Sequence, residues 1–240
     1  MISQVDKSSS RVRRMFGQIA GRYDFLNHLL SLNTDRYWRW QAVRHAPPTS
    51  GDRILDVCTG TGDLALAYQR QSGGNATVIG TDFCHEMLVV GAKKGQRAAA
   101  GRKIAWVEAD SQGLPFPDQT FQIVSVAFGL RNVADTDLGL REMARVCSAG
   151  GTVVVLEFSM PRFPPWRAVY GAYFRYVLPR VGQLLARNRE EAYNYLPASV
   201  GDFPQGESLA QRMRLAGLTS VRWHSLTFGV ATLYLGKKSS

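Results

Sequence analysis

The chain has 240 residues, 45% of them hydrophobic, and a formal net charge of +10. Its length suits one large α/β domain, and no repeat, like-charge block or long Pro/Ser/Gly tract marks a linker. No run approaches the roughly 18 apolar residues of a transmembrane helix, and the basic N-terminus lacks the apolar segment of a signal peptide. The three cysteines form neither a metal-ligand spacing nor an even disulfide set, so we expect a cytoplasmic protein without a metal site.

Three helices are predicted before the first strand. Apolar residues recur at i, i+3, i+4 and i+7 over residues 12–19, which is the pattern of an amphipathic helix. A second helix is predicted at 25–30 with Asp24 as its N-cap, and a third carries the aromatic cluster at 37–40. This helical segment, residues 1–50, is either a lid over a site or a brace on the edge of the sheet, and the sequence leaves both open.

Strand and helix patterns alternate through residues 51–240, which predicts an α/β fold with a doubly wound parallel sheet. The end of the chain breaks the alternation, because only three residues separate predicted strands 220–226 and 230–236. That spacing is too short for a crossover helix, so the two strands must form an antiparallel hairpin. The other predicted elements are strand 53–58, helix 63–71, strand 77–82, helix 85–100, strand 104–109, strand 122–128, helix 136–147, strand 152–158 and helix 208–216.

A glycine turn follows the first strand. Residues 54–63 read Ile-Leu-Asp-Val-Cys-Thr-Gly-Thr-Gly-Asp, an apolar run that passes through Gly60 and Gly62 into a helical pattern. A strand, a Gly-x-Gly turn and a helix N-terminus together present free backbone N–H groups to a nucleotide-like ligand. Asp82 ends the next strand about 20 residues later, where an acid that binds a ribose is expected. Without a ligand, the same pattern would be an ordinary tight turn.

Acidic residues end three successive strands: Asp56, Asp82 and Asp110. An isolated Asp at a strand end usually caps a helix or forms a turn. Three in register suit a ligand that carries an ammonium group, a ribose diol and an adenine amino group. S-adenosylmethionine has all three and no pyrophosphate, so we predict it as the cofactor. The glycine turn also satisfies the relaxed spacing of a dinucleotide fold, but the terminal hairpin argues against that fold.

The loop after the fourth strand, Phe128-Gly129-Leu130-Arg131-Asn132-Val133, carries a more specific signal. With this loop and the glycine turn, the chain resembles the C-methyltransferases of menaquinone and ubiquinone biosynthesis from about Val12 to its C-terminus. The resemblance implies a class I methyltransferase fold, with a seven-stranded Rossmann-like sheet, a terminal hairpin and N-terminal helices. The other matching strings are residues 114–118, 155–159 and 178–179, and the N-terminal residues Phe16, Ala20, Tyr23, Asp24 and Asn27.

The resemblance implies methyl transfer from S-adenosylmethionine to a ring carbon of a polyprenyl demethylquinol. The acceptor would be 2-demethylmenaquinol, with a benzoquinol of the ubiquinone pathway, or both quinols, as the alternative. Arg131, Asn132 and Tyr23 would face the quinol. Cys58 and Ala127 depart from the family pattern, because many relatives have a glycine and a cofactor-contacting serine at these positions. The residues expected to hold the cofactor are Asp56, Gly60, Thr61, Gly62, Asp82, Asp110 and Ser111.

The predicted chemistry requires an ionised quinol. A ring carbon becomes a good nucleophile only when the neighbouring hydroxyl loses its proton, and attack on a sulfonium then cancels two charges, which a dry site favours. Arg131 is a poor base because its guanidinium stays protonated, but it can hold the quinolate oxygen or order a water that accepts the proton. Outside this role it would be a solvated or salt-bridged surface Arg. The four histidines fall in no shared motif, so the general base stays open.

The stretch 158–189 contains no acidic residue and interleaves arginines with aromatic residues. This pattern is typical of an interfacial helix on an anionic membrane, of a helix that covers an apolar tunnel, or of a plain core helix. We expect residues 159–206 to form an insertion on the substrate side. The oligomeric state is left open, with a homodimer as one option. Two other functions are alternatives to a quinol methyltransferase: a nucleic-acid methyltransferase or RNA-binding module, which only the charge supports, and a cofactor-binding protein without catalysis. The residues of the basic aromatic pattern are Arg162, Arg167, Arg175, Arg180, Arg187 and Arg189, with Trp166, Tyr170, Tyr173, Phe174 and Tyr176.

Overall fold

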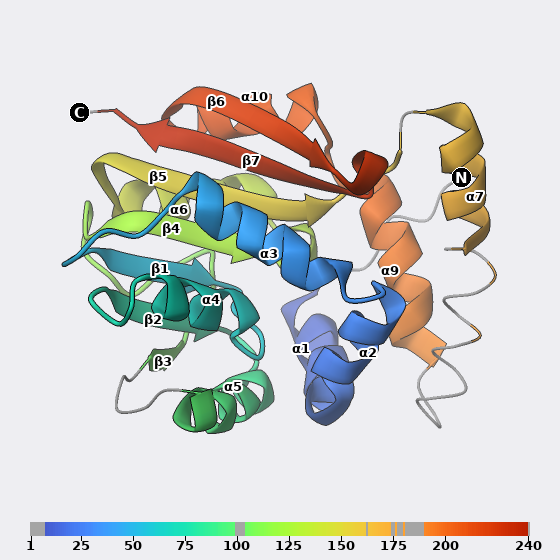
Figure 1. The fold of residues 1–240 in the computed structure, drawn as a ribbon, viewed down its shortest axis with the longest axis horizontal. Coiled ribbons are helices and arrows are strands. Elements are labelled where there is room, and N and C mark those ends of the chain that lie inside the picture. Colours follow the sequence, from blue (N-terminus) through green and yellow to red (C-terminus); the bar gives the residue numbers. More distant parts are fainter. Residues whose placement is uncertain are drawn as a thin grey trace.

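A computed structural model describes residues 8–98, 104–161, 163–173, 176, 180 and 190–239. Its strands are β1 (Arg53–Val57), β2 (Thr77–Asp82), β3 (Ala105–Glu108), β4 (Phe121–Ala127), β5 (Cys147–Phe158), β6 (Leu218–Leu226) and β7 (Ala231–Lys238). They form one sheet in the order β3-β2-β1-β4-β5-β7-β6 (Figure 1). Strands β1 to β5 run parallel, whereas β7 is antiparallel to both β5 and β6. The predicted parallel sheet with a terminal hairpin is therefore confirmed.

Helices cover both faces of this sheet and one of its ends. They are α1 (Ser9–Ile19), α2 (Tyr23–Leu30), α3 (Thr34–His45), α4 (Asp63–Gln71), α5 (His85–Ala98), α6 (Thr136–Val146), α7 (Pro164–Ala172), α9 (Glu190–Asp202) and α10 (Glu207–Leu215), with short 3-10 helices η1 (Ala20–Arg22), η2 (Leu130–Asn132) and η4 (Thr227–Gly229). Helices α3 and α4 pack on one face, and α6 and α10 on the other. Helices α1, α2, α7 and α9 gather at the end to which the parallel strands point (Figure 1).

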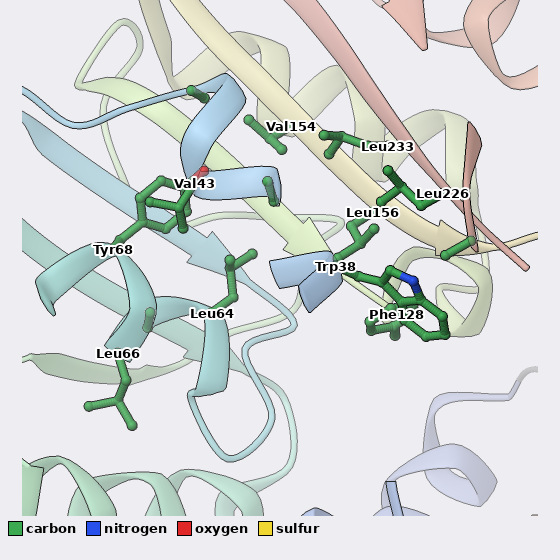
Figure 2. Packing of buried hydrophobic residues seen from close by; sticks show 14 of the residues in the cluster. Trp38, Val43, Leu64, Leu66, Tyr68, Phe128, Val154, Leu156, Leu226 and Leu233 are labelled. Atoms are coloured by element: carbon green, nitrogen blue, oxygen red, sulfur yellow. The ribbon is translucent and has the colours of Figure 1, made fainter. Parts of the chain in front are cut away.

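The strands are apolar because the sheet is buried on both faces. Successive residues of a strand point to opposite faces, so Val154 and Leu156 belong to the core under α3 and α4, while Val155 belongs to the core under α6 and α10. Figure 2 shows Trp38 and Val43 of α3 in the first of these cores. The consequence is a rigid sheet whose carboxyl end can hold loop residues in fixed positions.

The N-terminal helices divide into two groups. Trp38 of α3 is 1% exposed and its Nε1 donates to Thr227 Oγ1 at 2.7 Å, which fixes α3 to η4. Helix α3 therefore braces the sheet. Helices α1 and α2 instead lie beyond the carboxyl end of the sheet, where Phe16 and Tyr23 line the cavities described below.

Two local predictions were wrong. Cys147, expected inside helix 136–147, begins β5 because its backbone is extended, with φ −74° and ψ 130°. The strand then continues through Gly150, whose φ of +74° accommodates an irregular pairing with β4. Asp24 does not cap α2, which begins one residue earlier; its carboxylate accepts hydrogen bonds from Thr61 and Lys94 instead.

Some predictions fall outside the described residues. They are the last residues of predicted helix 85–100, together with Arg162, Phe174, Arg175, Arg187 and Arg189. Among the helices that the structure does describe, none is long and apolar enough to cross a membrane.

Candidate active site

A first cavity lies at the carboxyl ends of the parallel strands. Three acidic residues line it: Asp56 near the end of β1, Asp82 at the end of β2 and Asp110 just after β3. Gly60, Thr61 and Ser111 line it as well. Six of the seven residues predicted to hold the cofactor therefore meet in one place, as parallel strands that end at the same edge require.

Gly62 is the seventh, and it does not line this cavity. A Cβ at Gly62 would lie 2.2 Å from the Trp106 ring, and the residue has a φ of +83°. Its N–H donates to Thr59 O at 2.9 Å. The structure thus gives Gly62 a packing role, and its contact with the cofactor stays a prediction. Gly60 differs, because among the described residues beyond its chain neighbours only Tyr23, at 3.9 Å, lies within 4 Å of an added Cβ. The missing side chain of Gly60 leaves open space for a ligand.

Asp56 and Asp82 are held by hydrogen bonds from the loops around them. Asp56, 1% exposed, accepts from Thr59 Oγ1 at 2.6 Å and from Ser125 Oγ at 2.8 Å. Asp82 accepts from the Gly60 N–H at 2.8 Å and the Cys84 N–H at 2.9 Å. Burial disfavours the charged form and raises the pKa of each carboxyl to about 6, against the lowering effect of these bonds. Both carboxylates are thus oriented, and both titrate just below neutral pH.

Two strand ends carry strained backbone at this cavity. Cys58, after β1, has a φ of +50°, and Phe128, after β4, has a φ of +58°. This left-handed region disfavours residues with a Cβ, and such strain concentrates at functional sites. The glycine expected in relatives at position 58 would adopt this conformation freely. Gly129 is needed nearby, since a Cβ there would lie 2.4 Å from the Cys58 Cβ. The two loops are therefore in tight contact.

A second cavity, of about 370 Å³, adjoins the first. Four residues line both cavities: Phe16, Tyr23, Arg39 and Phe128. The walls are mainly aliphatic and aromatic, from α1, α2, α3, α7, α9, the end of β5 and residues 227–230. They include Ile19, Leu26, Leu30, Trp38, Phe158, Trp166, Tyr170, Tyr173, Tyr195 and Val230. The structure therefore places an apolar chamber beside the acidic one.

Three residues predicted to face the quinol meet where the cavities join. Tyr23 lines both, Arg131 lines the apolar cavity and Asn132 lines the acidic one. Within the described part of the chain, Arg131 Nε and Asn132 Oδ1 are buried and have no hydrogen-bond partner. Burial raises the pKa of Tyr23, although Arg131 and Asn27 oppose the shift, so its phenol stays protonated. Buried polar atoms are normally hydrogen-bonded, so the unused capacity of these two atoms at the junction is unusual.

Arg131 is neither solvated nor at the surface. It is 4% exposed, and its Nη1 pairs with Glu157 Oε2 at 3.0 Å. Its main-chain N–H also donates to Glu157 Oε1 at 3.1 Å, and Nη1 donates to Phe128 O. The guanidinium lies 5.2 Å from the Phe158 ring centroid. Glu157 therefore fixes the loop and the side chain together, and Nε has no hydrogen-bond partner among the described residues.

A chain of charges joins α2 to the glycine turn. Lys94 Nζ donates to Asp24 Oδ2 at 2.7 Å and to Asp63 Oδ1 at 2.6 Å. Among described residues, His28, Asp35 and Asp63 have their ligand atoms within 4.8 Å of one another, which is metal-like spacing. However, Asp35 already pairs with Arg39 at 2.5 Å and Asp63 with Lys94. Their charge is compensated, so this group is explained without an ion.

Sequence reasoning missed Arg39 and Glu157. Glu157 lies within a matching string, and an acid inside an otherwise apolar strand requires a buried partner, so it could have been found. Arg39 follows Asp35 by four residues on one helix, which predicts their ion pair but not a place at both cavities. The basic aromatic stretch was partly identified: Trp166, Tyr170 and Tyr173 face the apolar cavity, which favours the tunnel-covering interpretation of these residues.

The acidic cavity suits S-adenosylmethionine. Its lining includes the carboxylates of Asp56, Asp63, Asp82 and Asp110, which match a ligand with cationic sulfonium and ammonium groups. The open space at Gly60 and the oriented Asp82 carboxylate suit the close approach of a nucleoside.

Comparison with known proteins finds relatives along nearly the whole chain. Residues 4–238 match the ubiE/COQ5 methyltransferase family. The demethylmenaquinone methyltransferase of Thermus thermophilus is 46% identical over 224 residues, which cover 93% of this chain and 100% of that protein. The ubiquinone/menaquinone biosynthesis C-methyltransferase UbiE of Geobacter sulfurreducens is 43% identical over 235 residues, which cover 98% of this chain and 91% of that protein.

Solved structures agree on the fold. A SAM-dependent methyltransferase of Thermotoga maritima superposes with a TM-score of 0.67 at 18% identity, over 94% of this chain and 99% of that chain. The sequence matches confirm the predicted family and cofactor class. The chain belongs to the ubiE/COQ5 methyltransferase family and is an S-adenosylmethionine-dependent methyltransferase.

Proposed function

We propose that the chain methylates a ring carbon of 2-demethylmenaquinol, with the isoprenoid tail of the quinol in the apolar cavity. The observation that carries this proposal is the 370 Å³ apolar chamber that shares Tyr23 and Phe128 with the acidic cavity. A chamber of this character suits a hydrocarbon tail, and the shared wall suits a ring that must meet the methyl donor. The names of the two relatives described above support the same substrate class.

In this proposal Asp82 binds the ribose diol, Asp56 the ammonium group, and Asp110 with Ser111 the adenine end. Gly60 and Thr61 of the glycine turn form the cavity wall that lies close to the cofactor. When bound, S-adenosylmethionine supplies an electrophilic methyl group.

Arg131, Asn132 and Tyr23 act on the acceptor. Nε of Arg131 has no hydrogen-bond partner in the described part of the chain, and in this proposal it donates to the quinolate oxygen and stabilises its negative charge. Tyr23 stays protonated, so it donates a hydrogen bond rather than removing a proton. Phe128, Trp38 and Phe158 are in mutual ring contact at the junction and shield it from bulk water, while an ordered water can still accept the proton. A junction shielded from bulk water strengthens the interaction between Arg131 and the anion.

The proton of the quinol hydroxyl leaves through water in this proposal. Asp35 lines the apolar cavity, but Arg39 and its hydrogen bonds outweigh the effect of burial and lower its pKa, so it is a weak base. A hydroxyl beside Arg131 loses its proton more readily, because the cation favours the anion.

We further propose that the mouth of the apolar cavity meets an anionic membrane. Leu32 and Val169 line this cavity and are 80% and 59% exposed. Phe228 is 82% exposed, and its ring centroid lies 5.9 Å from that of Trp166 in the cavity wall. We call Leu32, Val169 and Phe228 the apolar rim. Exposed Arg167 and Arg180 belong to the same basic stretch, and cations beside exposed apolar groups favour anionic lipid surfaces.

A competition assay tests the substrate. The purified protein is given labelled S-adenosylmethionine with equal amounts of demethylmenaquinol and the polyprenyl methoxybenzoquinol, and a parallel sample contains total RNA. The proposal predicts label in the naphthoquinol. Label in both quinols would establish the dual activity, and label in RNA alone would reject the proposal.

A further inference from the structure

The carboxylate of the cofactor has no counter-charge among the residues assigned so far. The three acids at the strand ends account for its ammonium group, ribose diol and adenine amino group. Its amino-acid end also carries a carboxylate, which the same acids would repel. A carboxylate held in a partly buried site requires a cation or several N–H donors.

Arg39 is the one Lys, Arg or His side chain among the described residues that line the acidic cavity. Its side chain is 11% exposed, and its Nη1 pairs with Asp35 at 2.5 Å. Its Nη2 lies 3.6 Å from Asp63 Oδ2, which is beyond hydrogen-bond range. The guanidinium is also 5.5 Å from the Phe128 ring centroid. Asp35 thus anchors one nitrogen, and the other is held only loosely.

The position of Arg39 matches the amino-acid end of the ligand. Asp63 and Leu64, the first residues of α4, line the same cavity. A helix N-terminus favours an anion because its first N–H groups are unpaired. Arg39 and the start of α4 therefore converge near the glycine turn, on the side of the cavity away from Asp82 and Asp110 in strand order.

We propose that Arg39 binds the carboxylate of S-adenosylmethionine. This inference rests on the cofactor assignment and is independent of which quinol is methylated. It also gives α3 a second role, because the helix that braces the sheet through Trp38 carries, one residue later, the cation that recognises the cofactor.

Binding calorimetry with two ligands tests the proposal without any acceptor present. The ligands are S-adenosylmethionine and its decarboxylated form, which lacks only the carboxylate. We expect the native protein to prefer the intact ligand by about tenfold to a hundredfold, the scale of one charge-assisted hydrogen-bonded pair. In Arg39→Gln the preference should vanish or reverse, because the remaining acids then favour the more cationic ligand. Arg39→Lys should keep part of it.

Two controls separate recognition from a structural effect. Arg36→Gln removes an exposed arginine from the same helix and should keep the native preference. Asp35→Asn/Arg39→Gln removes both members of the ion pair, so that the fold no longer contains an unpaired buried carboxylate, and should show the same lost preference. Equal weakening of both ligands in the Arg39 variants, or a native protein that binds both equally, would overturn the proposal. Because the assay contains no quinol, a wrong acceptor cannot produce either result.

Discussion

Replacement of Arg131 by methionine should damage both folding and chemistry, and the structure separates the two effects. Glu157 is 1% exposed and accepts from the Arg131 N–H, from Nη1 and from the Phe158 N–H. Removal of the guanidinium leaves this carboxylate buried without its cation. Breaking such a pair costs about 3–5 kcal/mol. In a chain of this size that loss lowers Tm by roughly 10 °C.

The double variant Arg131→Met/Glu157→Gln removes the charge problem. The side-chain amide that replaces the carboxylate would still accept the main-chain N–H, so we expect the free energy of unfolding to return to within about 1–2 kcal/mol of the native value. The rate should not return, because the donor to the quinolate is still missing. We expect kcat to stay at least about a hundredfold low, the scale of losing one preorganised donor. Arg131→Lys, which keeps the charge but not the planar fork, should also lose most of its rate.

Thermal unfolding and single-turnover transfer of a labelled methyl group measure the two effects on the same samples. S-adenosylmethionine affinity should change little in either variant, since Arg131 lines the apolar cavity. A double variant that recovers both stability and rate would refute the reasoning. Arg131 would then serve only to neutralise Glu157.

Three further predictions concern Asp82, the glycine turn and the apolar rim. Burial raises the pKa of Asp82 and of Asp56 to about 6, so both carboxylates gain a proton as pH falls through this value. Calorimetry should show S-adenosylmethionine affinity falling by at least about tenfold from pH 7.5 to 5, and a pH-independent affinity would contradict their roles. Asp82→Asn should weaken binding at pH 7.5 and reduce this dependence to the part that Asp56 contributes. Gly62→Ala should lower the free energy of unfolding by roughly 2–4 kcal/mol, from backbone strain plus the collision with Trp106. The control Gly150→Ala, at a φ of +74° but with open space around the new Cβ, should lower it by only about 1–2 kcal/mol. Equal denaturation midpoints for the two variants would rule the collision out. Leu32→Ser/Phe228→Ser in the apolar rim should reduce binding to anionic vesicles, and salt should release the native protein. Leu215→Ser, 79% exposed on α10, is the matched control, and equal loss in both would reject the rim.

Sequence patterns were sufficient where short-range periodicity determines structure. The buried strands, the glycine turn and the short loop of the terminal hairpin were predictable, because each depends on residues close in sequence. The end of α6 was not predictable from the sequence. Cys147 continues the apolar spacing of the helix, and only its pairing with Phe121 across the sheet makes it a strand residue.

The candidate site likewise contains residues that the sequence predicts and residues that it does not. Acids at strand ends were predictable because parallel strands end at one edge. The pairing of Arg131 with Glu157 spans 26 residues, and that of Asp24 with Lys94 spans 70. No local pattern encodes such contacts. Arg39 was missed for a related reason: its place between two cavities depends on how α3 crosses the sheet.

The central claim, carbon methylation of a quinol at the junction of the two cavities, has one direct test. The protein is incubated with labelled S-adenosylmethionine and demethylmenaquinol, kept either reduced or oxidised, and the position of the new methyl group is determined by NMR. The account predicts a methyl group on the ring carbon with the reduced substrate and none with the oxidised quinone, which has no hydroxyl to ionise. A methyl group on oxygen, or equal methylation of the quinone, would contradict it.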